Sequence, residues 1–159
     1  MHELKDISCE KKFNIGTSDD IHNLLEWTED SFELNYNIVV PKMPIINNYI
    51  YYFHFGYTIG SEQAYDRPAL VVHTTKESRI CIVIPITKER LGDKIPYHID
   101  LDNGKGTALV EQIRTISKVR VYGKLFYKQE QATITENDRM QINRQLMYLC
   151  QLRPLWKNK

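Results

Sequence analysis

Apolar residues recur at helical spacing near the N-terminus, followed by a change to strand-like patterns further along the chain. The helical stripe consists of Ile21, Leu24, Leu25 and Phe32, with Trp27 at its edge. Ser18-Asp19-Asp20 precedes it, and such residues are typical of a helix start because they cap backbone N–H groups and match the positive end of the helix dipole. The pattern predicts one amphipathic helix over about residues 19–34.

The outer face of this predicted helix is acidic, with Glu26, Glu29, Asp30 and Glu33. One interpretation is a structural helix that packs on the core, and the other is a helix that covers a functional site or a partner's groove. Pro41 and Pro44 follow and indicate a linker. We therefore expect an N-terminal extension over residues 1–44, which begins with a polar arm over 1–17, and a main domain over residues 45–159.

The main domain shows short strand patterns separated by turn residues. Aromatic and β-branched side chains or apolar–polar alternation predict strands at 49–55, 67–72, 79–86, 97–101, 107–113 and 123–127, with a short helical turn at 117–121. We expect the first strand and that at 79–86 to be buried, the latter with Cys81 inside. Short strands with tight turns indicate a small, strongly bent antiparallel barrel with flanking helices, a mainly β fold.

The chain closes with a predicted helix. Thr135 followed by Asp138 resembles a capping box with the shorter acid. Its apolar side consists of Met140, Ile142, Leu146, Met147, Leu149 and Cys150. Pro154 is expected to end it.

Composition narrows the functional classes. The 159 residues are 42% hydrophobic and carry a net charge of +1, so a nucleic-acid partner would need a local basic patch. The three cysteines lie far apart, without the spacing of a metal site. No apolar run reaches the length of a membrane span, and the N-terminus lacks the apolar core of a signal peptide. We expect a cytoplasmic protein.

A polar loop before the second strand is the main candidate for chemistry. Gly60 opens it, and Ser61, Glu62 and Gln63 follow, close in sequence to Arg67. Pro68 favours an extended backbone at Arg67. Either this is a hairpin connection with a solvated arginine, or it is a functional loop held between strands.

Three stretches carry a family resemblance. Gly60-Ser61-Glu62-Gln63 with Arg67-Pro68-Ala69-Leu70-Val71-Val72 resembles the first signature of the MazF/PemK (Kid) toxin family. Val83-Ile84-Pro85-Ile86-Thr87 resembles its second strand pair. Glu111 to Lys118, followed by Gly123-Lys124-Leu125, resembles its third signature. The resemblance covers roughly residues 49–126, although Asn47-Asn48 replaces the family's usual basic-Gly-Asp turn.

The resemblance implies an SH3-like barrel, shared with the gyrase poison CcdB. It also implies a toxin of a toxin–antitoxin system: a metal-independent endoribonuclease without cofactors that cuts single-stranded RNA at short sequences. The products would carry a 2′,3′-cyclic phosphate and a 5′-hydroxyl. Such toxins act as homodimers and are neutralised by a small antitoxin with an acidic tail.

Residue by residue, Arg67 matches the family's catalytic arginine, and Thr87 matches a threonine that hydrogen-bonds the phosphate. An arginine fork suits phosphate oxygens and stays charged at working pH. Glu62, a carboxylate on the loop that matches the family's first signature, is our candidate base. His54, His73 and His98 are alternatives, each of which could equally be an ordinary strand histidine.

Further residues are candidates for substrate binding: Ser61, Gln63, Tyr65, Lys88 and Arg114. Tyr65 could stack on a base. Arg114 could contact phosphate, or it could fix the geometry of the barrel and dimer. Loop cations expected at the rim of the same face are Lys76, Lys88, Arg90 and Lys94, which could also be plain solvated surface.

A different class of function remains open: a non-catalytic binding module, or a topoisomerase poison like CcdB, on the same barrel. Arg67 and Thr87 argue against it, because a pure binder needs neither residue at these positions. For the extension we hypothesise that its acidic helix shields the RNA groove or modulates antitoxin binding.

Overall fold

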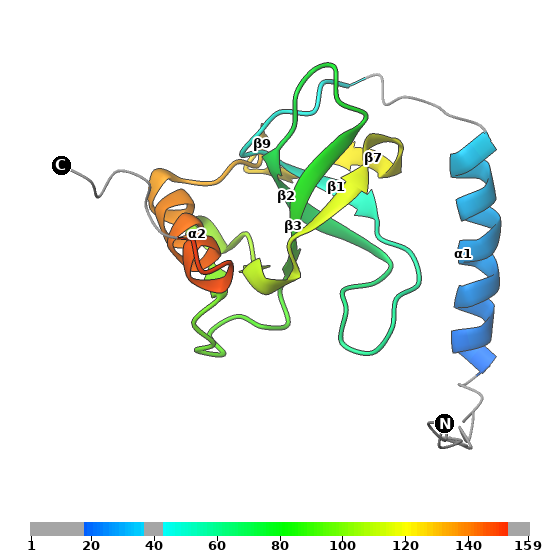
Figure 1. Ribbon diagram of the computed structural model, residues 1–159, viewed down its shortest axis with the longest axis horizontal. Coiled ribbons are helices and arrows are strands. Elements are labelled where there is room, and N and C mark those ends of the chain that lie inside the picture. The colour runs from blue at the N-terminus through cyan, green and yellow to red at the C-terminus, as the bar shows by residue number, and fades with distance from the viewer. Residues whose placement is uncertain (1–17, 37–42, 153–159) are drawn as a thin grey trace, which may run out of the picture.

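The computed structural model describes residues 18–36 and 43–152, which form two helices and a bent antiparallel sheet (Figure 1). Helix α1 spans Ser18–Tyr36 and helix α2 spans Glu136–Leu149. Both helices were expected from the apolar spacing. The predicted arm over 1–17, Pro41 and the helix stop at Pro154 lie outside the described residues.

The main sheet has seven strands in the order β4-β5-β3-β2-β1-β7, with β6 paired to β3. The strands are β1 (Ile50–His54), β2 (Asp66–His73), β3 (Ile80–Thr87), β4 (His98–Asp100), β5 (Thr107–Leu109), β6 (Arg114–Ser117) and β7 (Val121–Lys124). A separate hairpin joins β8 (Phe126–Tyr127) to β9 (Glu130–Gln131). The 3₁₀ turns are η1 (Asp102–Gly104), η2 (Val110–Gln112) and η3 (Lys118–Arg120).

The predicted mainly β fold with flanking helices is confirmed, but the sheet is not closed into a barrel. In the described ranges, β4 and β7 end the strand order and do not pair with each other. The strand predicted over 107–113 is correct only to Leu109. From Val110 the chain turns into η2, where the Ile113 amide donates to the Val110 carbonyl (3.3 Å). Because β5 ends at Leu109, its hydrogen-bonded pairing stops there and does not continue toward a closed barrel.

Two hydrophobic clusters lie on the two faces of the central strands, because successive strand side chains point to opposite faces. The first cluster includes Ile50, Leu70 and Ile84 with Ile142 of α2. The second includes Tyr51, Phe53, Phe55, Ala69, Val71, Cys81 and Val83. As predicted, β1 is buried on much of both faces, and the Cys81 thiol is buried, which raises its pKa to about 11.

The capping box at the start of α2 is confirmed. The Thr135 hydroxyl accepts from the Asp138 amide (3.1 Å), and the Asp138 carboxylate accepts from the Thr135 amide (2.9 Å). Asp138 is fully buried, and its other oxygen accepts from the Asp102 amide (3.0 Å). One carboxylate thus joins the helix start to the η1 turn.

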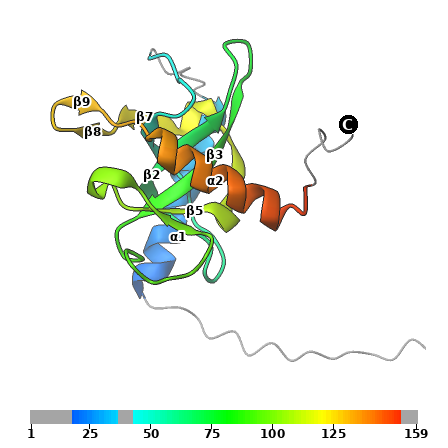
Figure 2. The ribbon, with the colours of Figure 1, turned by 90° about the vertical axis from the view of Figure 1, so that its left-hand side faces the viewer.

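The helices lie on opposite sides of the sheet. Figure 2 shows α2 on the near side and α1 behind it. The interpretation of α1 as a helix packed on the core is wrong, because no residue of α1 is buried. Its predicted apolar stripe is exposed in Ile21, Leu24, Leu25 and Phe32. Trp27, at the edge of that stripe, contacts the domain through Gly56 and Arg120.

Candidate active site

The strand register brings Arg67 and Thr87 to the same end of two neighbouring strands. β2 and β3 are antiparallel, with Ala69 opposite Pro85 and Val71 opposite Val83. Arg67 precedes Ala69 by two residues and Thr87 follows Pro85 by two, so the same register sets them across from each other on one face. Arg67 also pairs with Phe53 of β1, whose ring belongs to the second cluster. The two residues that the sequence marked for phosphate chemistry therefore lie together at the edge of this cluster.

The Arg67 side chain is half-buried and partly fixed. Its Nε donates to the Ala64 carbonyl (2.6 Å). Burial lowers the pKa of the guanidinium, and the negative charge of Glu89 opposes this shift. Within the described part of the chain, no hydrogen bond uses its two Nη groups. Arg67 thus presents a charged, oriented fork that can bind an anion.

Thr87 ends β3 in a tightly packed corner. Its hydroxyl accepts a hydrogen bond from the Glu89 amide (3.2 Å). Gly106 lies directly against it: a Cβ at Gly106 would come within 2.8 Å of the Thr87 carbonyl oxygen, and its φ is +112°. A glycine is required there, because a side chain would push Thr87 out of place.

Arg114 joins Arg67 and Thr87 on the same face. In β6 it pairs with Val83 of β3, and its guanidinium lies over the Phe55 ring, 5.1 Å from the centroid. Arg120 is close enough for its pKa to be lowered by the charge of Arg114, in addition to a larger effect of burial. The site therefore holds three arginines around the aromatic second cluster.

The polar loop before β2 forms one wall of a cavity of about 570 Å³. The cavity is lined by Ser61, Glu62, Glu111, Gln112, Ile113 and Arg114. Three of the predicted site residues, Ser61, Glu62 and Arg114, therefore meet here. Arg67 and Thr87 are not among the lining residues, and they lie near the start of β2 and at the end of β3.

Gln112 holds the loop in place. Its Oε1 accepts from the Gln63 amide (2.8 Å), and its Nε2 donates to the Ser61 carbonyl (3.3 Å). These bonds link residues about fifty positions apart, which no local sequence pattern reveals. Gln112 lies in the stretch from Glu111 to Lys118 that carries the family resemblance. Its contacts with the loop, however, follow from the fold and not from that stretch alone.

The remaining predicted binding residues surround the loop. Gln63 is half-buried, and its Oε1 is a buried acceptor without a hydrogen-bond partner among the described residues. Tyr65 is exposed, with a positive φ of 60° and an edge contact to Tyr57. Lys88 is exposed directly after Thr87. Each is available to a ligand at this end of the sheet.

Glu111 is a site residue that the sequence reading did not assign. It lines the cavity with Glu62, and its Oε1 lies 3.1 Å from His98 Nε2. His98 Nδ1 in turn lies 2.6 Å from Asp93 Oδ2, and the His98 side chain is only 8% exposed. The imidazole, flanked by two carboxylates, fixes Glu111 in the cavity wall.

The other two histidine candidates lie elsewhere. His54 is paired with Asp66 (2.6 Å), and it alternates in β1 with Phe53, so it points away from the second cluster. His73 is exposed at the opposite end of β2 from Arg67. Of the three, only His98 reaches the cavity, through Glu111.

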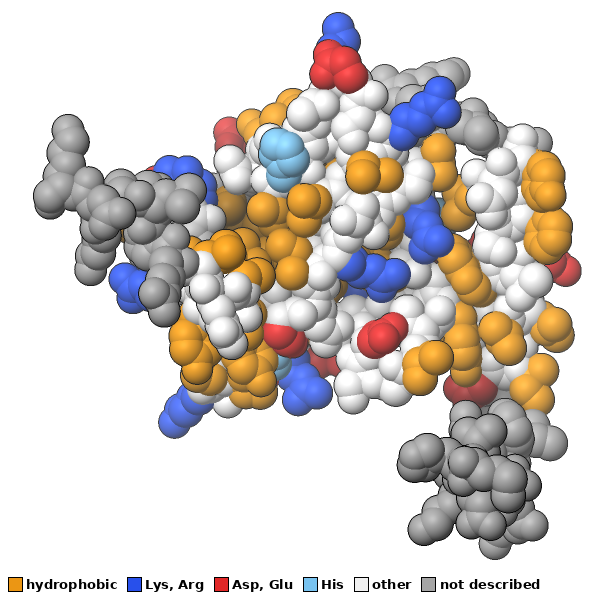
Figure 3. All heavy atoms as spheres, in the orientation of Figure 1, with side chains coloured by type: hydrophobic (Ala, Val, Ile, Leu, Met, Phe, Trp, Pro, Cys, Tyr) orange, Lys and Arg blue, Asp and Glu red, His pale blue; other side chains and the backbone are white. Residues whose placement is uncertain are grey.

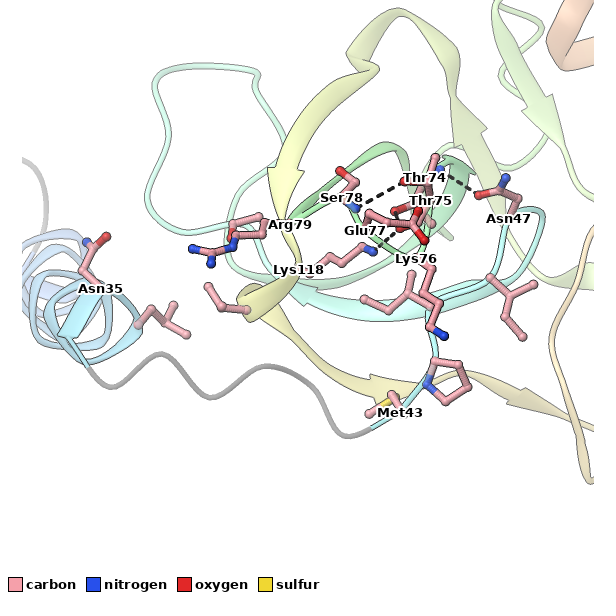
Figure 4. Close-up of a pocket in the computed structure, with 16 residues that line it drawn as sticks. Asn35, Met43, Asn47, Thr74, Thr75, Lys76, Glu77, Ser78, Arg79 and Lys118 are labelled. Atoms are coloured by element: carbon pink, nitrogen blue, oxygen red, sulfur yellow. Dashed lines mark hydrogen bonds between the residues drawn. The ribbon is translucent and has the colours of Figure 1, made fainter.

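The expectation that Lys76 shares a rim with Lys88, Arg90 and Lys94 is wrong for Lys76. Lys76 lies in the turn before β3, whereas Lys88 follows its other end, so the full strand separates them. Lys76 instead lines a second cavity of about 1040 Å³, which lies between the end of α1, the β2–β3 turn and η3 (Figure 4). No three His, Cys, Asp or Glu side chains in the described ranges are arranged to hold a metal ion.

Comparison with known proteins decides the family. The sequence model of the PemK-like, MazF-like toxins of type II toxin–antitoxin systems matches residues 48–150. The chain belongs to this family. The match continues beyond the motifs seen in the sequence to include α2, and it leaves α1 outside.

Relatives of this toxin include two proteins named as endoribonucleases. Endoribonuclease EndoA of Bacillus subtilis is 29% identical over 103 residues, which are 59% of this chain and 89% of EndoA. Endoribonuclease MazF of Staphylococcus saprophyticus is 32% identical over 93 residues, 53% of this chain and 78% of that protein.

Solved structures show the same fold for this MazF-like toxin. MazF of Deinococcus radiodurans aligns with a TM-score of 0.57 at 18% identity, over 70% of this chain and all of that one. A chain of the MazE–MazF structure from the same organism aligns with a TM-score of 0.54. Among the described residues, no helix is long and apolar enough to span a membrane.

Proposed function

We propose that this toxin is an endoribonuclease that cuts single-stranded RNA by transesterification, without a metal ion or other cofactor. In this reaction a ribose 2′-hydroxyl gives its proton to a base, and its oxygen attacks the adjacent phosphate. The bond from phosphorus to the 5′-oxygen breaks, and that oxygen takes a proton from solvent, which yields a 2′,3′-cyclic phosphate and a 5′-hydroxyl end. The observation that carries the proposal is the position of Arg67 across from Thr87, on the face that also presents Arg114. Two relatives of the chain are named as endoribonucleases.

Arg67 is the proposed electrostatic catalyst. Negative charge builds on the phosphorane oxygens in the transition state, and a preoriented cation in a partly dry site stabilises it. The bond from Nε to the Ala64 carbonyl aims the guanidinium and leaves its Nη groups for the phosphate. The Thr87 hydroxyl contributes a second hydrogen bond to the same phosphate.

The base that removes the 2′-hydroxyl proton is a carboxylate of the cavity. Glu62 is our first candidate, because it lines the cavity from the loop that matches the family's first signature. Glu111 is a second candidate, because it lines the same cavity and is held by His98. The substitutions Glu62→Gln and Glu111→Gln distinguish the two candidates. Only the substitution that removes the base should abolish the fall in cleavage rate at low pH.

Substrate binding involves the residues around the loop. Lys88 and Arg114 would bind phosphates, and Tyr65 would stack on a base. The unpartnered Oε1 of Gln63 would accept a hydrogen bond from a base edge or a ribose hydroxyl, because a buried acceptor without a partner is costly. Ser61 presents its hydroxyl at the cavity.

The assembly follows the family. We propose that the toxin works as a homodimer in the cytoplasm, where its RNA substrate is found, and that a small antitoxin with an acidic tail neutralises it. A solved MazE–MazF structure is similar to this chain in fold. The acidic tail would be attracted to the face that carries Arg67, Arg114 and Arg120.

Arg67→Ala tests the proposal against Arg144→Ala, a control on the exposed face of α2. We expect Arg67→Ala to lower the cleavage rate by about a hundredfold or more, as for loss of one preorganised transition-state donor. Arg144→Ala should cleave like the parent. If Arg67→Ala stopped cell growth as effectively as the parent, the toxic activity would be that of a binding module, such as a topoisomerase poison.

A further inference from the structure

A cationic segment leads away from the proposed active site. Residues 114–120, in β6 and η3, include Arg114, Lys118 and Arg120 and no acidic residue. We refer to these residues as the 114–120 segment. Arg114 borders the cavity of the proposed site, so the segment continues the positive surface beyond it. The chain as a whole has a net charge of only +1, so these three cations form a local positive patch on a nearly neutral protein.

The cations of this segment are held by backbone carbonyls. Arg120 Nη1 donates to the carbonyl of Phe55 (3.1 Å) and, more weakly, to that of His54 (3.4 Å). Lys118 Nζ donates to the Thr75 carbonyl (2.7 Å). Because no carboxylate neutralises either side chain in these bonds, both keep their positive charge available to an anion.

Helix α1 lies against the same segment. The Arg120 guanidinium lies over the Trp27 ring, 4.8 Å from its centroid. The indole also rests on Gly56, where a Cβ would come within 2.4 Å of the ring. Further along, Leu34 and Asn35 border the second cavity together with Arg79 and Lys118 (Figure 4). Lys and Arg side chains gather in the hollow between the sheet and α1 (Figure 3).

Helix α1 has a charge opposite in sign to that of the segment, and Glu26, Glu29, Asp30 and Glu33 are exposed on its outer face. Residues 18–36 contain six acidic side chains and no lysine or arginine: Asp19, Asp20, Glu26, Glu29, Asp30 and Glu33. No residue of α1 is buried, and its Trp27 indole lies against Arg120 and Gly56. One half-buried indole over a guanidinium is a weak contact, which a phosphate anion can displace.

We propose that the 114–120 segment binds the phosphates of single-stranded RNA, and that α1 occupies this segment in the free toxin, so that RNA must displace Trp27. This inference rests on RNA being the substrate. It assigns Arg120 and Lys118 to RNA binding beyond the catalytic site. It also gives the N-terminal extension the role of a competitor within the same chain.

Direct RNA binding tests the competition. In the Arg67→Ala background, which leaves the RNA uncut, we compare dissociation constants for single-stranded RNA with and without Trp27→Ala. We expect Trp27→Ala to tighten binding roughly threefold or more, because loss of one exposed cation–π contact frees the segment. Phe32→Ala is the matched control: Phe32 is an exposed aromatic of the same helix that stacks on Tyr36, and its loss should leave binding unchanged.

Fluorescence of Trp27 gives a second readout. The chain has two tryptophans, so Trp156→Phe leaves Trp27 as the only one. Saturating RNA should shift its emission to longer wavelength, because the indole leaves Gly56 and Arg120 for water. Emission that stays constant while RNA saturates the protein, or RNA binding that is equal or weaker in Trp27→Ala, would overturn the inference.

Failure of the proposed activity would look different. A toxin that cuts no RNA, yet binds it more tightly after Trp27→Ala, would contradict the proposed endoribonuclease and support the competition. If the parent and Trp27→Ala cut RNA at the same rate and bind it with the same affinity, the proposed endoribonuclease would stand. The proposed competition by α1 would then be contradicted. Arg120→Gln should weaken RNA binding in the Trp27→Ala background, where α1 no longer covers the segment.

Discussion

At the scale of single residues, the sequence identified Arg67 and Thr87 but not their partners. The proline after Arg67 and the strand patterns around both residues are local signals, and the register then aligned them at one edge. Glu111 was missed because the turn at Val110–Gln112 was predicted as a strand. Its link to His98 and Asp93 depends on where that turn lies against β4, which no local pattern encodes.

Asp138 should be the most costly carboxylate to remove. It is fully buried and accepts from the amides of Asp102 and Thr135. In Asp138→Ala both buried N–H groups lose their partner, so we expect the free energy of unfolding to fall by about 3 kcal/mol. Urea denaturation followed by circular dichroism measures this.

Glu136→Gln is the control for that prediction. Glu136 lies in the same turn, but its ion pair with Arg139 is exposed, and such pairs contribute little. Its denaturation midpoint should match the parent. Equal effects of the two substitutions would show that Asp138 does not join α2 to η1 as described.

At the scale of elements, the local patterns predicted both helices, most strands and the capping box of α2. They misjudged elements whose extent depends on distant contacts. β5 is short because η2 turns the chain to meet the 61–63 loop, and α1 is amphipathic without a buried face. Amphipathic spacing predicts a helix but does not say what its apolar face contacts.

Gln112 should control the order of the loop before β2. Gln112→Leu removes the acceptor for the Gln63 amide and the donor to the Ser61 carbonyl. We expect KM for RNA to rise by about tenfold with a smaller change in kcat, because two bonds that preorganise the loop are lost. Steady-state cleavage of a short RNA measures both constants.

Hydrogen exchange at the Gln63 amide gives a direct check on the loop. Its protection should fall in Gln112→Leu and stay unchanged in Gln145→Leu, a substitution on α2. If KM rose while the Gln63 amide remained protected, Gln112 would act on RNA itself rather than by ordering the loop.

At the scale of the whole molecule, the family resemblance predicted the fold class, but an open sheet replaced the expected closed barrel. The division into an extension over residues 1–44 and a main domain over residues 45–159 stays a prediction, and no residue of α1 is buried. The core begins close to the proposed boundary: Met43 and Ile45 pack on the second cluster, and the Tyr51 hydroxyl donates to the Pro44 carbonyl (3.1 Å).

Deletion of residues 1–42 should therefore leave a folded domain. We expect its Tm to fall by no more than a few degrees, because α1 has no buried residue and a cation–π contact such as that of Trp27 is weak. Deletion of residues 1–46 should cost far more, since it removes Met43, Ile45 and the bonds around the Tyr51 hydroxyl. Differential scanning calorimetry measures both, and similar losses in the two truncations would contradict the division.

Mapping of RNA ends tests the central claim most directly. The purified toxin is incubated with a long single-stranded RNA and excess chelator, and the new ends are identified. We predict cuts at one short motif with 5′-hydroxyl and 2′,3′-cyclic phosphate ends, absent in Arg67→Ala. Uncut RNA with a folded, dimeric protein, or equal cutting by Arg67→Ala, would contradict an endoribonuclease that works through Arg67.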